Sequence, residues 1–114
     1  MTADPTPEPE PSTGGAPWSC EVVSTEPLVV AVTGELDTLT GPHVQDGLVA
    51  AIQASSGPVC IEFEGVSFID SQGLSALINV RQQFPDRAFR ISNPRSNVKR
   101  LIEITGLNQT FEIA

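Results

Sequence analysis

The spacing of hydrophobic positions changes along the chain and separates strands from helices. Runs rich in apolar and β-branched residues predict strands at 19–25, 28–34, 59–63, 88–92 and 110–113. Between them, apolar residues recur every three or four positions, which predicts helices that begin near residues 41, 71 and 96. The predicted buried stripes are Val44, Leu48, Val49 and Ile52, then Leu74, Leu77, Ile78 and Phe84, then Val98, Leu101, Ile102 and Thr105.

These elements follow one another in the order ββαβαβαβ. The short turn at Glu26-Pro27 favours an antiparallel hairpin of the first two strands. The later alternation of strands and helices favours parallel strand pairs with helices on a sheet face. We therefore predict a single α/β domain over residues 18–114, with a mixed sheet of about five strands packed against helices.

Local signals mark the helix ends. Thr40 is a candidate N-cap of the first helix, with Pro42 in its first turn. Gly106 is placed to end the third helix in a left-handed conformation.

The first 17 residues have a different composition from the rest. They hold five prolines, two glycines and three acidic residues, with almost nothing to bury, which predicts a disordered tail. The tail has no apolar stretch typical of a signal peptide. Nor does any apolar run approach the roughly 20 residues that span a bilayer. We therefore expect a cytoplasmic protein, no membrane partner, and reduced, buried Cys20 and Cys60.

Charge is distributed unevenly. The formal net charge is −8, and all six basic residues lie between positions 81 and 100. Residues 1–80 carry eleven acidic residues and no Lys or Arg. Such a surface repels nucleic acid and favours a partner with a basic docking face. For the basic segment we expect a solvated helix face.

The segment 68–74 is the main candidate site, because Ser71 falls where a helix begins. A hydroxyl there is exposed near the positive end of the helix dipole. Either Ser71 accepts a phosphate, or Ser71 or Asp70 is simply the N-cap of the helix. The helix N-terminus offers unpaired N–H groups that could hold such a phosphate. Gly73 in the first turn indicates a close approach, by a partner or by a neighbouring loop. Asp37 lies on a loop expected beside Ser71, where it either contacts a partner or shapes the turn.

Catalytic motifs and metal sites are disfavoured. A nucleophile elbow requires Gly two residues before Ser71, and that position is Ile69. The sequence therefore disfavours a triad of Ser71, His43 and an Asp. It also contains no phosphate-binding P-loop pattern. Two cysteines without ligand spacing and a single His disfavour zinc. We expect a binding module without cofactors, not an enzyme, and keep a small hydrolase as an alternative.

Three motifs resemble the STAS domain of bacterial anti-sigma factor antagonists. They are Gly34-Glu35-Leu36-Asp37, then Ser67 to Leu74 (Ser-Phe-Ile-Asp-Ser-Gln-Gly-Leu), then Val98 to Leu107 with its Thr-Gly-Leu exit. The resemblance covers roughly residues 19–113. It implies that Ser71 is the regulatory phosphoserine, and that Asp70 and Asp37 are the family's neighbouring acids. The predicted partner-binding residues are Asp37, Asp70, Ser71, Gln72, Gly73 and Leu74.

The resemblance also implies a switch between partners. The unphosphorylated protein would bind an anti-sigma factor, an ATP-bound serine kinase of the histidine-kinase-like fold, and so release the sigma factor. Phosphorylation of Ser71 would end that binding, and a PPM-type phosphatase would restore it. We expect a monomer or weak homodimer. The alternative within the family is a subunit of a stress-signalling complex or a lipid-transport ATPase.

The sequence departs from the family pattern in two places. Gln72 follows Ser71 where a second small hydroxyl residue is frequent, which leaves one expected phosphate acceptor. Family members commonly continue into a C-terminal helix, whereas this sequence ends at Ala114, so we expect a shortened or trimmed member.

Overall fold

The computed structural model describes residues 18–114, and the predicted tail of residues 1–17 lies outside them. In chain order the elements are β1 (Ser19–Thr25), β2 (Leu28–Leu36), α1 (Gly41–Gln53), β3 (Val59–Ile69), α2 (Ser71–Gln83), β4 (Phe89–Ser92), α3 (Ser96–Ile104), a 3₁₀ helix (Leu107–Gln109) and β5 (Glu112–Ile113). This order confirms the predicted ββαβαβαβ arrangement.

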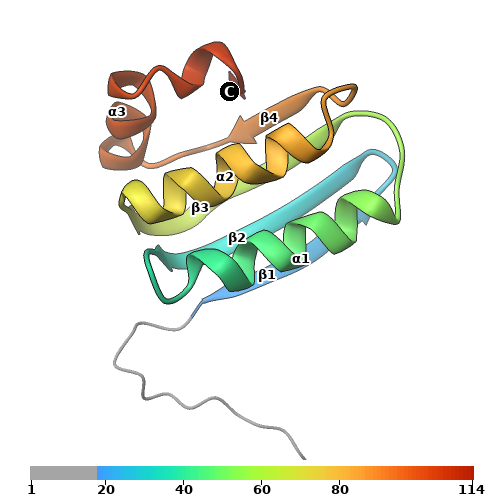
Figure 1. The fold of residues 1–114 in the computed structure, drawn as a ribbon, viewed down its shortest axis with the longest axis horizontal. Coiled ribbons are helices and arrows are strands. Elements are labelled where there is room, and N and C mark those ends of the chain that lie inside the picture. Colours follow the sequence, from blue (N-terminus) through green and yellow to red (C-terminus); the bar gives the residue numbers. More distant parts are fainter. Residues whose placement is uncertain (1–17) are drawn as a thin grey trace, which may run out of the picture.

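The five strands form one mixed sheet in the order β1-β2-β3-β4-β5. The β1–β2 pair is antiparallel, and the other three pairs are parallel. Helices α1 and α2 lie side by side across the sheet (Figure 1), and α3 packs beside β3. Because β2 to β5 are parallel, their carboxyl ends share one edge of the sheet.

The core lies between this sheet and the helices. In β2, Val30 and Val32 are fully buried, whereas Val29 and Ala31 on the other sheet face are half-buried. The helices contribute Val44, Leu48 and Ile52 from α1, Leu74, Leu77 and Val80 from α2, and Val98 and Ile102 from α3.

Two predicted core positions are wrong. Ile78 is 36% exposed, and Val80, three residues after Leu77, takes its place in the buried stripe of α2. Thr105 is exposed, because it lies at the end of α3, where its hydroxyl donates to the carbonyls of Leu101 and Ile102. Gly106 adopts a φ of 81°, the left-handed conformation predicted for this helix end.

Strand β3 is longer than predicted. Polar Glu64 and Ser67, with Gly65 between them, interrupt the apolar pattern, but the strand continues to Ile69 by pairing with β2. The β2–β3 ladder accommodates this through two register shifts, and Gly65 pairs with Thr33. A Cβ atom at Gly65 would lie 2.6 Å from Thr33 Cγ2, so the close strand approach requires glycine here.

Within residues 18–114, the second half of β3 pairs with no strand on its β4 side, because β4 pairs only with residues 59–62. Side chains near the start of α3 occupy that position instead. Arg95 Nε donates to the Glu64 carbonyl at 3.0 Å, and Asn97 Nδ2 donates to the Ser67 carbonyl at 3.1 Å. These bonds place α3 against the edge of β3.

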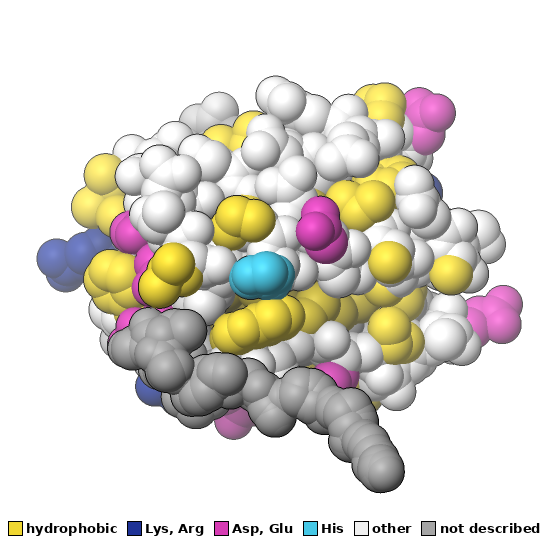
Figure 2. All heavy atoms as spheres, turned by 60° about the horizontal axis from the view of Figure 1, so that its bottom comes forward, with side chains coloured by type: hydrophobic (Ala, Val, Ile, Leu, Met, Phe, Trp, Pro, Cys, Tyr) yellow, Lys and Arg dark blue, Asp and Glu magenta, His cyan; other side chains and the backbone are white. Residues whose placement is uncertain are grey.

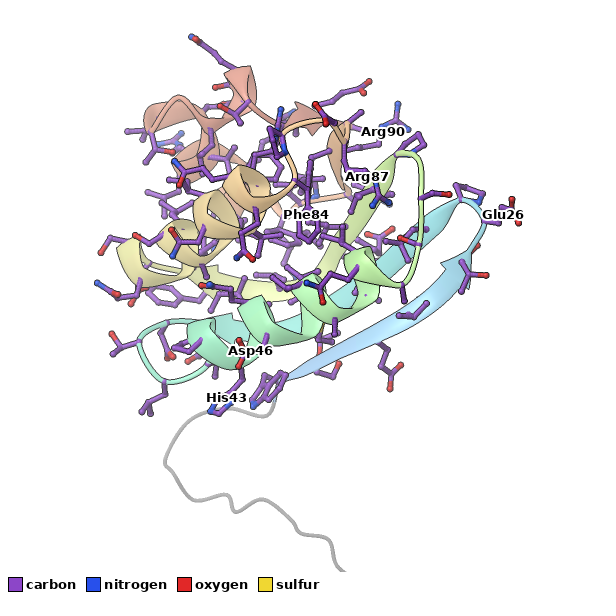
Figure 3. All side chains as sticks on the ribbon, turned by 45° about the vertical axis from the view of Figure 1, so that its right-hand side comes forward. Glu26, His43, Asp46, Phe84, Arg87 and Arg90 are labelled. Carbon is purple, nitrogen blue, oxygen red and sulfur yellow. The ribbon has the colours of Figure 1, made fainter. Side chains whose placement is uncertain are left out.

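The basic residues do not form one solvated helix face, contrary to prediction. Arg81 lies on α2 with its guanidinium 5.3 Å from the Phe89 ring centroid. Arg87 precedes β4 and reaches the end of α1 and the segment after it (Figure 3). Its guanidinium donates to Gly57 O, Ile52 O, Ser55 O and Ser55 Oγ. Only Arg95, Lys99 and Arg100 cluster around α3.

Cys20 and Cys60 are free thiols, as predicted, but they are half-buried, whereas buried side chains were predicted. Cys20 faces α1, where a Cβ atom on Gly47 would lie 3.0 Å from its sulfur. Burial raises the pKa of the Cys20 thiol, because the thiolate loses hydration there. Across residues 18–114, every helix is too short or too polar to cross a bilayer.

Candidate functional site

Two loops meet at the carboxyl edge of the parallel strands. Leu36 at the end of β2 pairs with Ile69 at the end of β3, and the Asp70 amide donates to the Leu36 carbonyl at 3.1 Å. Asp37 and Asp70 are therefore the first residues beyond two adjacent strands. The predicted side-by-side placement of these loops is confirmed.

Asp70, not Ser71, caps helix α2. One carboxylate oxygen, Oδ1, accepts from the amides of Gln72 at 2.9 Å and Gly73 at 3.1 Å. Ser71 is the first residue of the helix and is exposed. The capping role that the sequence left open between these two residues belongs to Asp70, so Ser71 Oγ is not required to hold the helix start.

Gly73 allows helix α2 to begin against the neighbouring strand end. A Cβ atom there would lie 2.5 Å from the Leu36 carbonyl oxygen and 2.8 Å from both Leu36 Cβ and Ile69 Cγ1. Gly73 and Leu74 are both buried. Of the two explanations the sequence offered for Gly73, close packing of loop and helix accounts for the structure, and a partner's approach is not needed to explain it.

Asp37 shapes its own loop. Its Oδ1 accepts from the amides of Leu39 at 3.0 Å and Thr40 at 3.1 Å, an Asx-type turn, and its carbonyl accepts from the Gly41 amide at 2.8 Å. Asp37 as a whole is half-buried, so part of the residue remains accessible at the surface.

Thr40 has a role that the sequence analysis assigned differently. Its side chain makes no capping bond to α1, and its backbone is already helical, with φ −91° and ψ −26°. The buried hydroxyl donates to the Glu35 carbonyl and accepts from the Asp37 amide at 3.0 Å. The Thr40 hydroxyl thus links Glu35, before the Asp37 turn, to Asp37 itself. This role is visible in the structure and has no signal in the sequence.

His43 lies in the first turn of α1, away from any triad geometry. Its ring stacks on Trp18, with centroids 5.6 Å apart and planes at 14°. On the face of the molecule that carries His43, hydrophobic side chains gather beside the histidine, and basic side chains appear only at the margins of the view (Figure 2). In the part of the chain that the structure describes, no hydrogen bond joins His43 to Ser71.

A family comparison identifies this architecture. The family model of the STAS domain matches residues 21–114, which include both loops and all three helices. The chain belongs to the STAS domain family. The resemblance inferred from the three motifs is therefore confirmed.

Relatives of this STAS domain include proteins named anti-sigma-B factor antagonist. The protein from Staphylococcus aureus strain NCTC 8325 is 30% identical over 86 residues, which cover 74% of this chain and 80% of the relative. The protein from Staphylococcus epidermidis matches over the same length with 30% identity.

Solved structures share the STAS fold. A crystal structure of an anti-sigma factor antagonist from Mycobacterium paratuberculosis superposes with a TM-score of 0.73 at 27% identity, covering 87% of this chain and 88% of that chain. The unphosphorylated form of the anti-sigma factor antagonist SpoIIAA gives 0.62 at 24% identity, covering 86% and 88%. The phosphorylated form of SpoIIAA also matches, with a TM-score of 0.59.

Proposed function

We propose that this STAS domain is an anti-sigma factor antagonist whose partner binding is switched off by phosphorylation of Ser71. Its relatives are named as antagonists of this class, which supports the general assignment. The observation that carries the switch is the position of Ser71: exposed, first in α2, and not used as the cap. The unphosphorylated form binds an anti-sigma factor that is itself an ATP-bound serine kinase, and a PPM-type phosphatase reverses the modification.

The cap geometry changes how the phosphate would act. The sequence suggested that helix amides could hold a phosphate on Ser71. The amides of Gln72 and Gly73 already donate to Asp70 Oδ1, so they are not available without displacing that carboxylate. A phosphate would therefore add about −1.5 to −2 charges at the surface, next to the acids Asp70 and Asp37.

This accumulation of charge explains why binding would stop while the fold persists. The cap, the Asp37 turn and the packing at Gly73 do not use the Ser71 hydroxyl. A partner that covers Ser71 would have to bury unpaired charge, a cost of about 2–5 kcal/mol. At about 1.4 kcal/mol per tenfold change, that lowers affinity by roughly 30-fold to several thousandfold.

The proposal is tested with paired baits. Ser71→Ala should retain binding to the anti-sigma factor, and Ser71→Glu should weaken that binding by about 30-fold or more. Ser75→Glu is the matched control, because Ser75 is an exposed serine one turn further along the same helix. Incubation with ATP and the recovered kinase, followed by mass spectrometry, should place phosphate on Ser71. Equal binding by Ser71→Glu and Ser75→Glu, or phosphate on another residue, would contradict the switch.

The partner surface is proposed to comprise Asp37, Asp70, Ser71 and Gln72, with Gly73 and Leu74 supporting them from beneath. Asp37 and Asp70 are half-buried, and their accessible parts favour a basic docking face on the anti-sigma factor. Affinity should then fall as ionic strength rises, because salt screens exposed charges. A titration with sodium chloride that leaves affinity unchanged would remove this electrostatic component and leave the Ser71 switch untouched.

A further inference from the structure

A groove adjoins the Ser71 loop on the α3 side. It has a volume of about 220 Å³, and its walls come from the end of β3 and from α3. Phe68, 46% exposed, lies three residues before Ser71, and Ile104, 72% exposed, lies on the α3 wall. The lining residues are Phe68, Ile69, Asn97, Val98, Arg100, Leu101 and Ile104.

The proposed switch surface is too small to hold a partner alone. Stable interfaces bury about 800 Å² per partner, from roughly 20–30 residues. The accessible positions on the two loops are six: Asp37, Thr38, Leu39, Asp70, Ser71 and Gln72. Contact that includes Ser71 must therefore extend onto neighbouring surface, and the groove begins within the same β3–α2 connection.

The groove differs from the loops in both charge and polarity. The loops carry Asp37 and Asp70, whereas α3 and the residue before it carry three basic residues, Arg95, Lys99 and Arg100, against one acid, Glu103. Arg100 lines the groove itself, beside apolar side chains. Binding energy at interfaces concentrates where an apolar anchor enters such a hollow and polar groups surround it.

We propose that the groove receives an apolar side chain of the anti-sigma factor, with an acidic residue of that partner facing Arg100. This inference rests on the proposed function, since it places the same partner across both surfaces. The partner then presents basic groups to Asp37 and Asp70, and an apolar and acidic segment to α3. Because the two patches differ in sign, a partner bound in the reverse orientation would meet like charges on both.

The test is a titration with the purified, ATP-loaded anti-sigma factor kinase recovered with the Ser71→Ala bait. Ile104→Ser should weaken binding at least tenfold. Its matched control is Val23→Ser, because Val23 is 64% exposed and lies on β1 at the far edge of the sheet. Arg100→Glu should weaken binding more than Lys99→Glu, which changes the net charge equally on the same helix outside the groove. Urea denaturation of each variant verifies that folding is unchanged.

The outcomes separate the groove from the switch. Loss of binding by Ser71→Glu with normal binding by Ile104→Ser overturns the groove and leaves the switch standing. Failure of the wild-type protein to bind any anti-sigma factor overturns both. A wild-type dimer that Ile104→Ser converts to monomer, measured by light scattering, would assign the groove to a second copy of this chain and overturn the proposal. A photo-crosslinker at position 104 that captures the kinase, while one at position 23 does not, supports it.

Discussion

Replacing Gly73 with alanine tests the close packing between α2 and the end of β2. The added Cβ atom would lie 2.5 Å from the Leu36 carbonyl oxygen, whereas ordinary contacts begin near 3.4 Å. The two elements must therefore separate by about 0.9 Å. The nearest atom belongs to the backbone of a paired strand residue, so a simple side-chain rotation cannot relieve the contact.

The expected energy is a balance of two terms. Alanine is favoured over glycine inside a helix by about 1 kcal/mol. Overpacking a tightly packed position costs about 1–3 kcal/mol, and a backbone contact lies toward the upper part of that range. We expect Gly73→Ala to lower the free energy of unfolding by about 1–2 kcal/mol, which corresponds to a fall of roughly 4–15 °C in Tm for a domain of this size.

The assay is equilibrium unfolding in urea, followed by far-UV circular dichroism. The midpoint should fall while the slope m stays constant, because the surface exposed on unfolding is nearly the same. Gly41→Ala is the matched control: it lies at the start of α1, and its added Cβ would be 3.4 Å from the Gln72 carbonyl oxygen. That contact is tolerable, so the control should be neutral or more stable by about 0.4–1 kcal/mol.

Stability of Gly73→Ala equal to that of the wild type would refute the packing argument. If that variant also lost the anti-sigma factor, Gly73 would instead serve the close approach of the partner. The same experiment therefore distinguishes the two explanations that the sequence offered.

Three further substitutions test the site and its support. Asp70→Ala removes the α2 cap and should lower the free energy of unfolding, measured in urea, by about 1 kcal/mol. Asp70→Asn should retain most of the wild-type stability, because asparagine also caps helices. Equal stability of the two variants would contradict the capping role. Arg87→Lys keeps the positive charge but loses the guanidinium hydrogen bonds to the backbone around residues 52–57. The midpoint of urea unfolding should therefore fall by the equivalent of about 1–3 kcal/mol. An unchanged midpoint would show that these hydrogen bonds contribute nothing to stability. The raised pKa of Cys20 means that the folded state retains this proton to higher pH than the unfolded state. The free energy of unfolding should therefore decline as pH rises past about 8.5, the ordinary pKa of a thiol. The measurement compares the wild type with Cys20→Ala between about pH 7 and 9.5. A decline of equal size in the two proteins would exclude the Cys20 thiol as the source of the pH dependence.

The periodicity of apolar residues was sufficient to predict the order of helices and strands, because the buried residues of most elements recur at the spacing of a single type of secondary structure. The boundaries of β3 could not be predicted in the same way. Its second half contains Glu64, Gly65 and Ser67, and its stability comes from pairing with β2 and from the side chains of α3. Both contributions are long-range and leave no periodic signal in the strand itself.

At the candidate site, too, some features could be predicted from the sequence and others depended on the folded structure. The motif around Ser71 was visible in the sequence, and so was the choice between cap and phosphate acceptor. Which of Asp70 and Ser71 caps the helix depended on the backbone at Asp70, which is extended at φ −117° and ψ −171° and aims the carboxylate at two amides. The role of Thr40 was mistaken because threonine before a helix is most often a cap, while here the tight Asp37 turn uses its hydroxyl.

The exposed edge of β3 has a consequence for the solution behaviour of the protein. An unpaired strand edge is a template on which another chain can add a strand. Here Arg95 and Asn97 occupy the carbonyls of Glu64 and Ser67, so an incoming strand would find those acceptors already used. The two side chains therefore oppose edge-to-edge association at this strand. They lie next to the segment that we propose contacts a partner.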